Sequence, residues 1–262
     1  MNEYLGELIR AHAPLFWGSA FTAALLVISL GLMAFDSRLV TGANPWLKPV
    51  KFELSIVAFN LTVAWMLTRL AASGREARVI EWVVAVAMFI EITAIVVQAA
   101  RGMPSHYNIT TPLNAAIFGS MGSAILANTL ALVWLCVLYF SPQPQLPPAI
   151  MWGVRLGIIL FLLSSLQGFQ MISNRGHTVG AADGGPGLPL VRWSTVAGDL
   201  RIAHFIGLHA LQALPLLGFI VSTENRQAGV PVVAAAFVAI LALFIWTLLQ
   251  AWAGRPLRIF SA

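Results

Sequence analysis

Two histidines, an arginine and a glutamine lie in one otherwise apolar stretch, GDLRIAHFIGLHALQALPL, residues 198–216. At about 100° per residue of an α-helix, Arg201, His204, His209 and Gln212 fall within one arc of about 140°. Imidazole groups ordinarily titrate near neutral pH, which suits them to take up and release protons. We therefore expect His204 and His209 to be catalytic proton-transfer residues.

A carboxyl group occurs deep inside another apolar stretch. Glu91, Gln98 and Arg101 are seven and three residues apart, which places them on one helical face. Glu91 lies about 15 Å from Arg101 along the helix axis, near the centre of a bilayer. Ionisable side chains at that depth are costly, and they are commonly paired and functional. We expect Glu91 to be the buried carboxyl partner of the two histidines.

Long apolar runs must position these residues. The chain has 262 residues, of which 59% are hydrophobic and 10% charged, and its mean hydropathy is +0.83. A soluble domain carries far more charge, whereas a membrane-spanning helix needs about 20 mostly apolar residues. Seven runs meet that requirement, at about 15–35, 52–72, 79–100, 113–140, 149–173, 202–222 and 230–252. The sequence predicts an all-α polytopic membrane protein, a single integral membrane domain over residues 1–262 with a seven-transmembrane-helix bundle.

Polar residues follow one side of the second, third, fifth and sixth runs. All four polar stripes lead to the membrane face on which the seventh run ends, named here the C-terminal face. We expect a polar cavity open to that face. Single amides and hydroxyls such as Asn60, Ser164 and Gln167 are equally compatible with hydrogen bonds between helices. Glu53 is expected to form a surface ion pair with Lys51, and His12 to lie at the opposite membrane surface.

The connections on the C-terminal face hold most of the remaining chemistry. Lysine and arginine side chains there could surround a phosphate or carboxylate, for which arginine is especially suited. The connection 174–201 is too long for a minimal loop, so we expect either a folded lid or a flexible segment. The candidate ligand-binding residues are Lys48, Lys51, Gln98, Arg101, Ser105, His106, Asn108, Arg175, His177, Trp193, Asp199, Arg201 and Gln212.

A metal or haem site is an alternative use of the histidines. The candidate ligands are His106, His177, His204 and His209. Residues five apart on a helix point about 140° apart, so His204 and His209 make a poor pair of ligands without a loop histidine. The seventh run, 230–252, contains no lysine, which excludes retinal chemistry. The sequence identifies no cofactor.

The net charge of +5 arises from residues near the helix ends. That position indicates the membrane surface, and membrane lipid rather than nucleic acid as partner. Nine of the 15 Lys and Arg residues belong to the C-terminal face, so the positive-inside rule predicts that this face is cytoplasmic. The sequence indicates no oligomeric state.

These observations favour a membrane-embedded enzyme or lipid-binding protein for an amphiphilic, anionic, lipid-like or isoprenoid-like ligand. Three alternatives stay open: a proton-coupled transporter, a metal- or haem-binding redox protein, and a non-catalytic subunit of a membrane complex. The predicted polar stripes fade before the N-terminal face, which is why the transporter is ranked behind the enzyme or binding protein.

Overall fold

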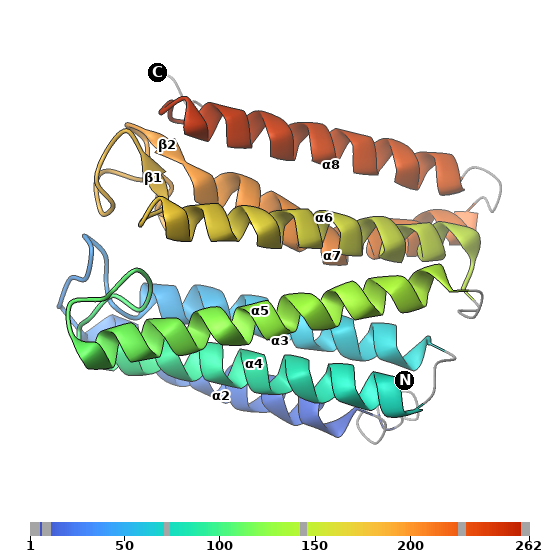
Figure 1. Cartoon of the computed structure of the whole chain (residues 1–262), viewed down its shortest axis with the longest axis horizontal. Coiled ribbons are helices and arrows are strands. Elements are labelled where there is room, and N and C mark those ends of the chain that lie inside the picture. Colours follow the sequence, from blue (N-terminus) through green and yellow to red (C-terminus); the bar gives the residue numbers. More distant parts are fainter. Residues whose placement is uncertain (1–5, 7–11, 71–73, 142–145, 225–228, 258–262) are drawn as a thin grey trace. The chain divides into compact units, whose positions relative to one another are not determined.

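The computed structural model describes Gly6 and residues 12–70, 74–141, 146–224 and 229–257 (Figure 1). Of the residues that the structure describes, 75% are helical. Within the described residues, seven helices are long and apolar enough to cross a membrane. The predicted fold class is therefore confirmed: the chain is an integral, multi-pass, all-α membrane protein. Which face is cytoplasmic stays a prediction, as does the polar cavity.

The helices agree with the predicted runs to within five residues. They are α2 (Ala13–Phe35), α3 (Leu47–Thr68), α4 (Gly74–Ala100), α5 (Pro112–Phe140), α6 (Pro148–Ser173), α7 (Leu200–Glu224) and α8 (Gly229–Trp252). The largest differences are at α3 and α4, which both begin five residues early. In α3 the added first turn contains Lys48, Pro49 and Lys51, which a search for apolar runs leaves out. Proline is well tolerated in a first turn because its missing N–H is not needed there.

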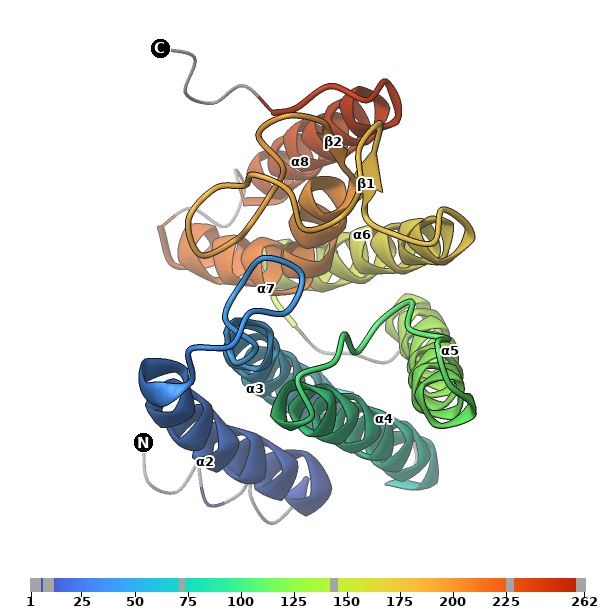
Figure 2. The ribbon, with the colours of Figure 1, turned by 90° about the vertical axis from the view of Figure 1, so that its left-hand side faces the viewer.

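The chain divides into two compact units, Met1–Gln145 and Leu146–Ala262, each described by itself. In the first unit α2, α3 and α4 each pack against the other two, and α5 packs against α4 (Figures 1 and 2). Val63, Ile80 and Leu132 are fully buried there. Near the C-terminal end of α3, the Tyr139 hydroxyl of α5 donates a 2.8 Å hydrogen bond to the carbonyl oxygen of Met66. The expectation of a single domain stays a prediction.

In the second unit, glycines bring α6 and α7 into close contact. A Cβ atom at Gly153 of α6 would lie 2.5 Å from the Leu214 carbonyl oxygen, and one at Gly218 of α7 would lie 2.5 Å from that of Ala149. Small residues permit such close backbone approach in membrane proteins, where packing rather than hydrophobic burial holds helices together. The third helix, α8, packs on both α6 and α7.

The long loop of the second unit is folded. Its strands β1 (Thr178–Val179) and β2 (Gly198–Asp199) pair antiparallel and contact α8. The Asp183 carboxylate accepts hydrogen bonds from the backbone N–H groups of His177 and Thr178 at 3.2 and 2.9 Å. Of the two expectations for this loop, the structure supports the folded one; its role as a lid stays a prediction.

Candidate functional site

The connection between α4 and α5, residues 101–111, is held against both helix ends. Arg101 donates from Nη1 to Oε1 of Gln98 at 2.5 Å and to Oδ1 of Asn114 at 3.0 Å, and Gln98 also donates to that Asn114 oxygen at 3.2 Å. Asn108 donates to the carbonyl oxygen of Pro104 at 3.1 Å. Thr111 caps α5 by accepting from the backbone N–H of Asn114. In Figure 2 this loop spans the ends of α4 and α5.

This fold of the loop brings His106 to Glu91. The Nε2 atom of His106 lies 3.5 Å from Oε1 of Glu91, whose side chain is only 4% exposed. On the other side of the ring, Nδ1 of His106 lies 3.0 Å from Nζ of Lys48 and 3.2 Å from Oγ of Ser105. The imidazole therefore connects a cation and a hydroxyl group to a carboxyl group about 14 Å inside the end of α4.

Aromatic rings surround the same imidazole. The rings of Phe52, Tyr107 and Phe118 have centroids 5.8, 6.0 and 6.1 Å from that of His106. Nζ of Lys48 also lies 5.5 Å from the centroid of the Phe52 ring, within reach of a cation–π interaction. Tyr107 has a backbone φ of 57°, the left-handed region that a non-glycine residue rarely adopts. This strained turn holds His106 and Tyr107 side by side.

The neighbours of His106 select one tautomer. A lysine ammonium group has only donors, so a contact with Nδ1 needs that nitrogen to accept. The ring proton of a neutral imidazole then lies on Nε2, where it faces the carboxyl group of Glu91. This arrangement has the components of a general base: an accepting nitrogen near the surface and a buried carboxyl group that orients the ring.

A second polar group organises the connection between α2 and α3. Hydrogen bonds from Arg38 hold the pKa of Asp36 well below its ordinary range, and the indole N–H of Trp46 donates to the same carboxylate at 2.8 Å. Arg38 also donates to the carbonyl oxygen of Ala100, the last residue of α4, at 3.1 Å. These bonds fix the loop that precedes α3, and Lys48 lies in the first turn of that helix.

The second unit holds the other predicted histidines. His204 Nδ1 lies 2.9 Å from the carbonyl oxygen of Ser164, and the Ser164 hydroxyl donates to the His204 carbonyl oxygen at 2.6 Å. These contacts join α6 to α7. His209 packs against Phe205, with ring centroids 4.3 Å apart. The two imidazoles have different neighbours, in agreement with their spacing of five residues.

The Asp199 carboxylate organises the start of α7. Its oxygens accept from Arg201 at 2.9 and 2.6 Å and from the backbone N–H of Ser194 at 2.8 Å, and Arg201 donates further to the carbonyl oxygen of Arg192. Burial raises the pKa of Asp199, but the hydrogen bonds and charge of Arg201 and the Ser194 N–H together leave it below its ordinary value. Arg201, expected to hold an anionic ligand, thus has a structural partner.

The structure brings together part of the predicted site. Lys48, Ser105, His106 and Glu91 form one cluster, named here the His106 cluster. Gln98 and Arg101 bond to each other and Gln98 bonds to the Pro104 carbonyl oxygen of the loop that carries His106 and Asn108. His177 instead pairs with Asp183 at 3.2 Å. Glu91 belongs to the first unit and His204 and His209 to the second, so their pairing stays a prediction. So do the ligand-binding roles of Lys51, Arg175, Trp193 and Gln212.

Sequence reasoning missed the burial of three polar groups in the first unit: Glu53, Glu81 and His12. Glu53 is 0% exposed and accepts from the Ser29 hydroxyl at 2.7 Å, so its expected place at the surface is wrong. Glu53 lies about one turn and a half inside α3, which begins at Leu47. The apolar run begins at about residue 52, so the sequence predicts that Glu53 lies at the end of the helix. His12 is buried as well, and its Nδ1 lies 3.5 Å from Oε2 of Glu81. The signal was Glu81 itself, a second carboxyl group in the third apolar run.

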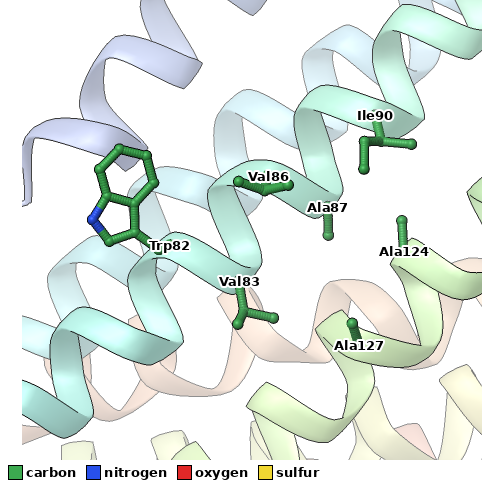
Figure 3. A pocket seen from close by; sticks show the side chains of 7 residues that line it. All are labelled: Trp82, Val83, Val86, Ala87, Ile90, Ala124 and Ala127. Carbon is green, nitrogen blue, oxygen red and sulfur yellow. The ribbon is translucent and has the colours of Figure 1, made fainter.

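An apolar groove of about 360 Å³ runs between α4 and α5. Figure 3 shows Ala87 and Ile90 of α4 and Ala124 and Ala127 of α5 around it; Trp82, Val83 and Val86 complete the lining. Ile90 directly precedes Glu91 in the chain, so the groove begins near the depth of the His106 cluster and continues toward the N-terminal face.

Within the part of the chain that the structure describes, no three His, Cys, Asp or Glu side chains gather in a group that could hold a metal ion. No protein-family model, curated protein or solved structure matches the chain. A proposal about function therefore depends on the geometry of these sites.

Proposed function

We propose that the chain binds an anionic amphiphile, with its headgroup at the His106 cluster and one hydrocarbon chain in the groove between α4 and α5. The observation that carries this proposal is the position of the His106 imidazole between the Lys48 ammonium group and the buried Glu91 carboxyl group. A phosphate or carboxylate headgroup offers Lys48 a charged acceptor, which it prefers to a neutral imidazole nitrogen.

Ligand binding and proton transfer would be coupled at Lys48. When Lys48 turns its N–H donors to an anionic headgroup, Nδ1 of His106 becomes available to accept a proton from an acidic O–H of the ligand. The Nε2–H group then donates to Glu91, and the carboxyl group stabilises the imidazolium that forms. The site would thus bind a headgroup that carries both negative charge and an exchangeable proton, and it is equipped for general-base chemistry on it.

The hydrocarbon part of the ligand would follow the α4–α5 groove. Its lining is entirely apolar, and an apolar groove at membrane depth suits a lipid or isoprenoid chain. Phe118 of α5 contacts His106 and lies six residues, about 9 Å, before Ala124. The proposed headgroup position at His106 and the proposed position of the hydrocarbon chain in the groove therefore follow one another along α4 and α5.

Lipid binding to the purified, delipidated protein tests the headgroup position. Dioleoyl phosphatidic acid and dioleoyl phosphatidylcholine share their chains but differ in headgroup charge. We expect the wild-type protein to prefer phosphatidic acid, and Lys48→Ala to weaken that binding at least about tenfold because it removes a charge-assisted contact. The control is Arg255→Ala, which removes the same charge from the second unit. Equal affinities for both lipids would contradict the proposal.

A second comparison tests the groove. Ala127→Phe places a ring in the α4–α5 groove, and we expect it to weaken binding of dioleoyl phosphatidic acid more than that of the dihexanoyl form, whose chains are too short to reach it. Ala85→Phe is the matched control, since Ala85 lines a neighbouring groove of about 350 Å³ between α2 and α4, which shares only Trp82 and Val86 with the first. If Ala85→Phe and Ala127→Phe had the same effect on both lipids, the hydrocarbon chain of the lipid would not lie in the α4–α5 groove.

A further inference from the structure

Buried polar groups extend through the first unit well beyond the His106 cluster. We propose that α2, α3 and α4 form a transmembrane proton pathway, which runs from His106 and Glu91 on the C-terminal side to Glu81 and His12 on the N-terminal side. This activity is separate from the binding of an amphiphile, although His106 and Glu91 would take part in both.

The C-terminal half of the pathway contains two carboxyl groups. Glu91 contacts His106 as described above. Glu53 lies six residues inside α3, about 9 Å from the start of that helix, and is bonded to Ser29 of α2. Glu53 is 0% exposed and Glu91 3% exposed. Two carboxyl groups therefore lie inside the same three-helix group, on neighbouring helices.

The N-terminal half contains a second carboxyl–histidine pair. Glu81 lies seven residues, about 10 Å, inside the N-terminal end of α4. It is 4% exposed, and Oε2 lies 3.5 Å from Nδ1 of His12, the residue that precedes α2. His12 thus stands toward the N-terminal face as His106 stands toward the C-terminal face, each in contact with a buried glutamate of α4.

Asn60 lies between the two halves. It is two helical turns from Glu53 on the same side of α3, is 1% exposed, and has its amide nitrogen 3.6 Å from the place of a Cβ atom at Gly18 of α2. Its side chain therefore points into the contact between α2 and α3, as Glu53 does. An amide group does not relay a proton itself, but it can hold a water molecule that does.

Each of these groups keeps an oxygen atom available. Within the described residues, Glu53 Oε2, Glu81 Oε1, Glu91 Oε2 and Asn60 Oδ1 have no hydrogen-bond partner. Buried polar atoms are normally bonded, and water commonly supplies the missing bond. Hydrogen bonds that merely join helices would use these atoms on neighbouring side chains. Four acceptors at successive depths instead favour a chain of water molecules and carboxyl groups.

The proton balance is simple. His106 takes one proton from water at the C-terminal face and passes the Nε2 proton to Glu91. Water molecules carry it from Glu91 past Asn60 to Glu81, and Glu81 passes it to Nδ1 of His12, which releases its other ring proton to the N-terminal face. Each imidazole then turns its ring to regain its starting tautomer. Lys48 faces the entrance, and Lys51 lies in the same first turn of α3. No other bond is made or broken, and the direction follows the electrochemical gradient.

Proton flux into liposomes tests this proposal with the full-length protein. A potassium diffusion potential set by valinomycin drives protons inward, and enclosed pyranine reports the internal pH. We expect wild-type flux well above that of empty liposomes, and at least about tenfold lower flux for Glu81→Gln, because an amide cannot carry the proton. Glu81→Asp, which keeps a carboxyl group, should retain measurable flux. This variant separates loss of proton transfer from loss of folding.

Two comparisons complete the experiment. Glu76→Gln makes the same chemical change in the first turn of the same helix, outside the pathway, and should conduct like the wild type. Glu81→Gln should also bind phosphatidic acid normally, because Glu81 belongs to the opposite end of α4 from the His106 cluster. Wild-type flux equal to that of empty liposomes, or full flux in Glu81→Gln, would overturn the pathway without touching the lipid-binding proposal.

Discussion

His106 and Glu91 are 15 residues apart in the chain, yet Nε2 of one lies 3.5 Å from Oε1 of the other. The contact exists because residues 101–111 turn back onto the helix that precedes them, with the Tyr107 backbone in the left-handed region. A loop at the membrane face thereby supplies the imidazole that contacts a carboxyl group inside the membrane. Both proposals depend on this pair.

The α6–α7 contact predicts that Gly153 cannot be enlarged. Gly153→Ala should lower the free energy of unfolding by about 1–3 kcal/mol, because its methyl group meets the Leu214 backbone, which cannot move aside alone. Gly119→Ala is the control: nothing lies within 4 Å of a Cβ atom there, and alanine favours helix. Thermal unfolding in detergent measures both. Equal transition temperatures for the two variants would show that the helices do not approach so closely.

Loss of the Tyr139 hydroxyl group should lower the free energy of unfolding less than Gly153→Ala does. Tyr139→Phe removes the hydrogen bond between α5 and the Met66 carbonyl oxygen, which keeps the Arg69 backbone N–H as donor at 3.0 Å, and should cost about 1 kcal/mol. Thr62→Val also deletes a hydroxyl group, but that group is exposed and bonds only to its own helix, at Ala58. Its effect should be smaller than that of Tyr139→Phe in the same thermal measurement. The reverse order would argue against the α3–α5 bond.

Asp199 predicts a pH dependence of the long loop. Since its pKa is lower in the folded loop than in the unfolded chain, its stabilising contribution is complete above the unfolded value of about 4. The contribution is lost as the pH falls through the lower, folded value. Amide hydrogen exchange of residues 186–199, corrected for intrinsic rates, should therefore quicken below about pH 4. In Asp199→Asn the exchange should already be fast at neutral pH, and no further change of this kind should follow acidification.

The sequence was sufficient to predict the seven helices because lipid imposes a minimum length and a high apolar content on each span. Their ends were less certain where charged residues extend a helix beyond its apolar run. The apolar run therefore predicts a loop position for Lys48 and Lys51 and a surface position for Glu53, although all three lie in α3. A helix can carry lysines in its first turn because their long side chains reach the interface.

The sequence predicts on which membrane face the site lies, but it predicts only some of the contacts between the side chains of the site. Helical periodicity relates residues of one helix, so it predicts that Gln98 and Arg101, the residue that follows α4, lie on one side, and these two side chains are hydrogen-bonded. It carries no information about where a loop turns, and the approach of His106 to Glu91 depends on such a turn. The pairing of His12 with Glu81 joins residues almost 70 positions apart and likewise follows from the packing of α2 on α4.

The most direct measurement of the central claim is the ¹⁵N NMR spectrum of histidine-labelled protein in lipid nanodiscs, with His106→Asn used to assign the signal. Lys48 and Glu91 require the ring proton of neutral His106 to lie on Nε2, and phosphatidic acid should shift the Nδ1 resonance toward its protonated position. Phosphatidylcholine should leave that resonance unchanged. A proton on Nδ1 in the lipid-free protein, or an identical response to both lipids, would contradict the contact between Lys48, His106 and Glu91 as the site of anion binding.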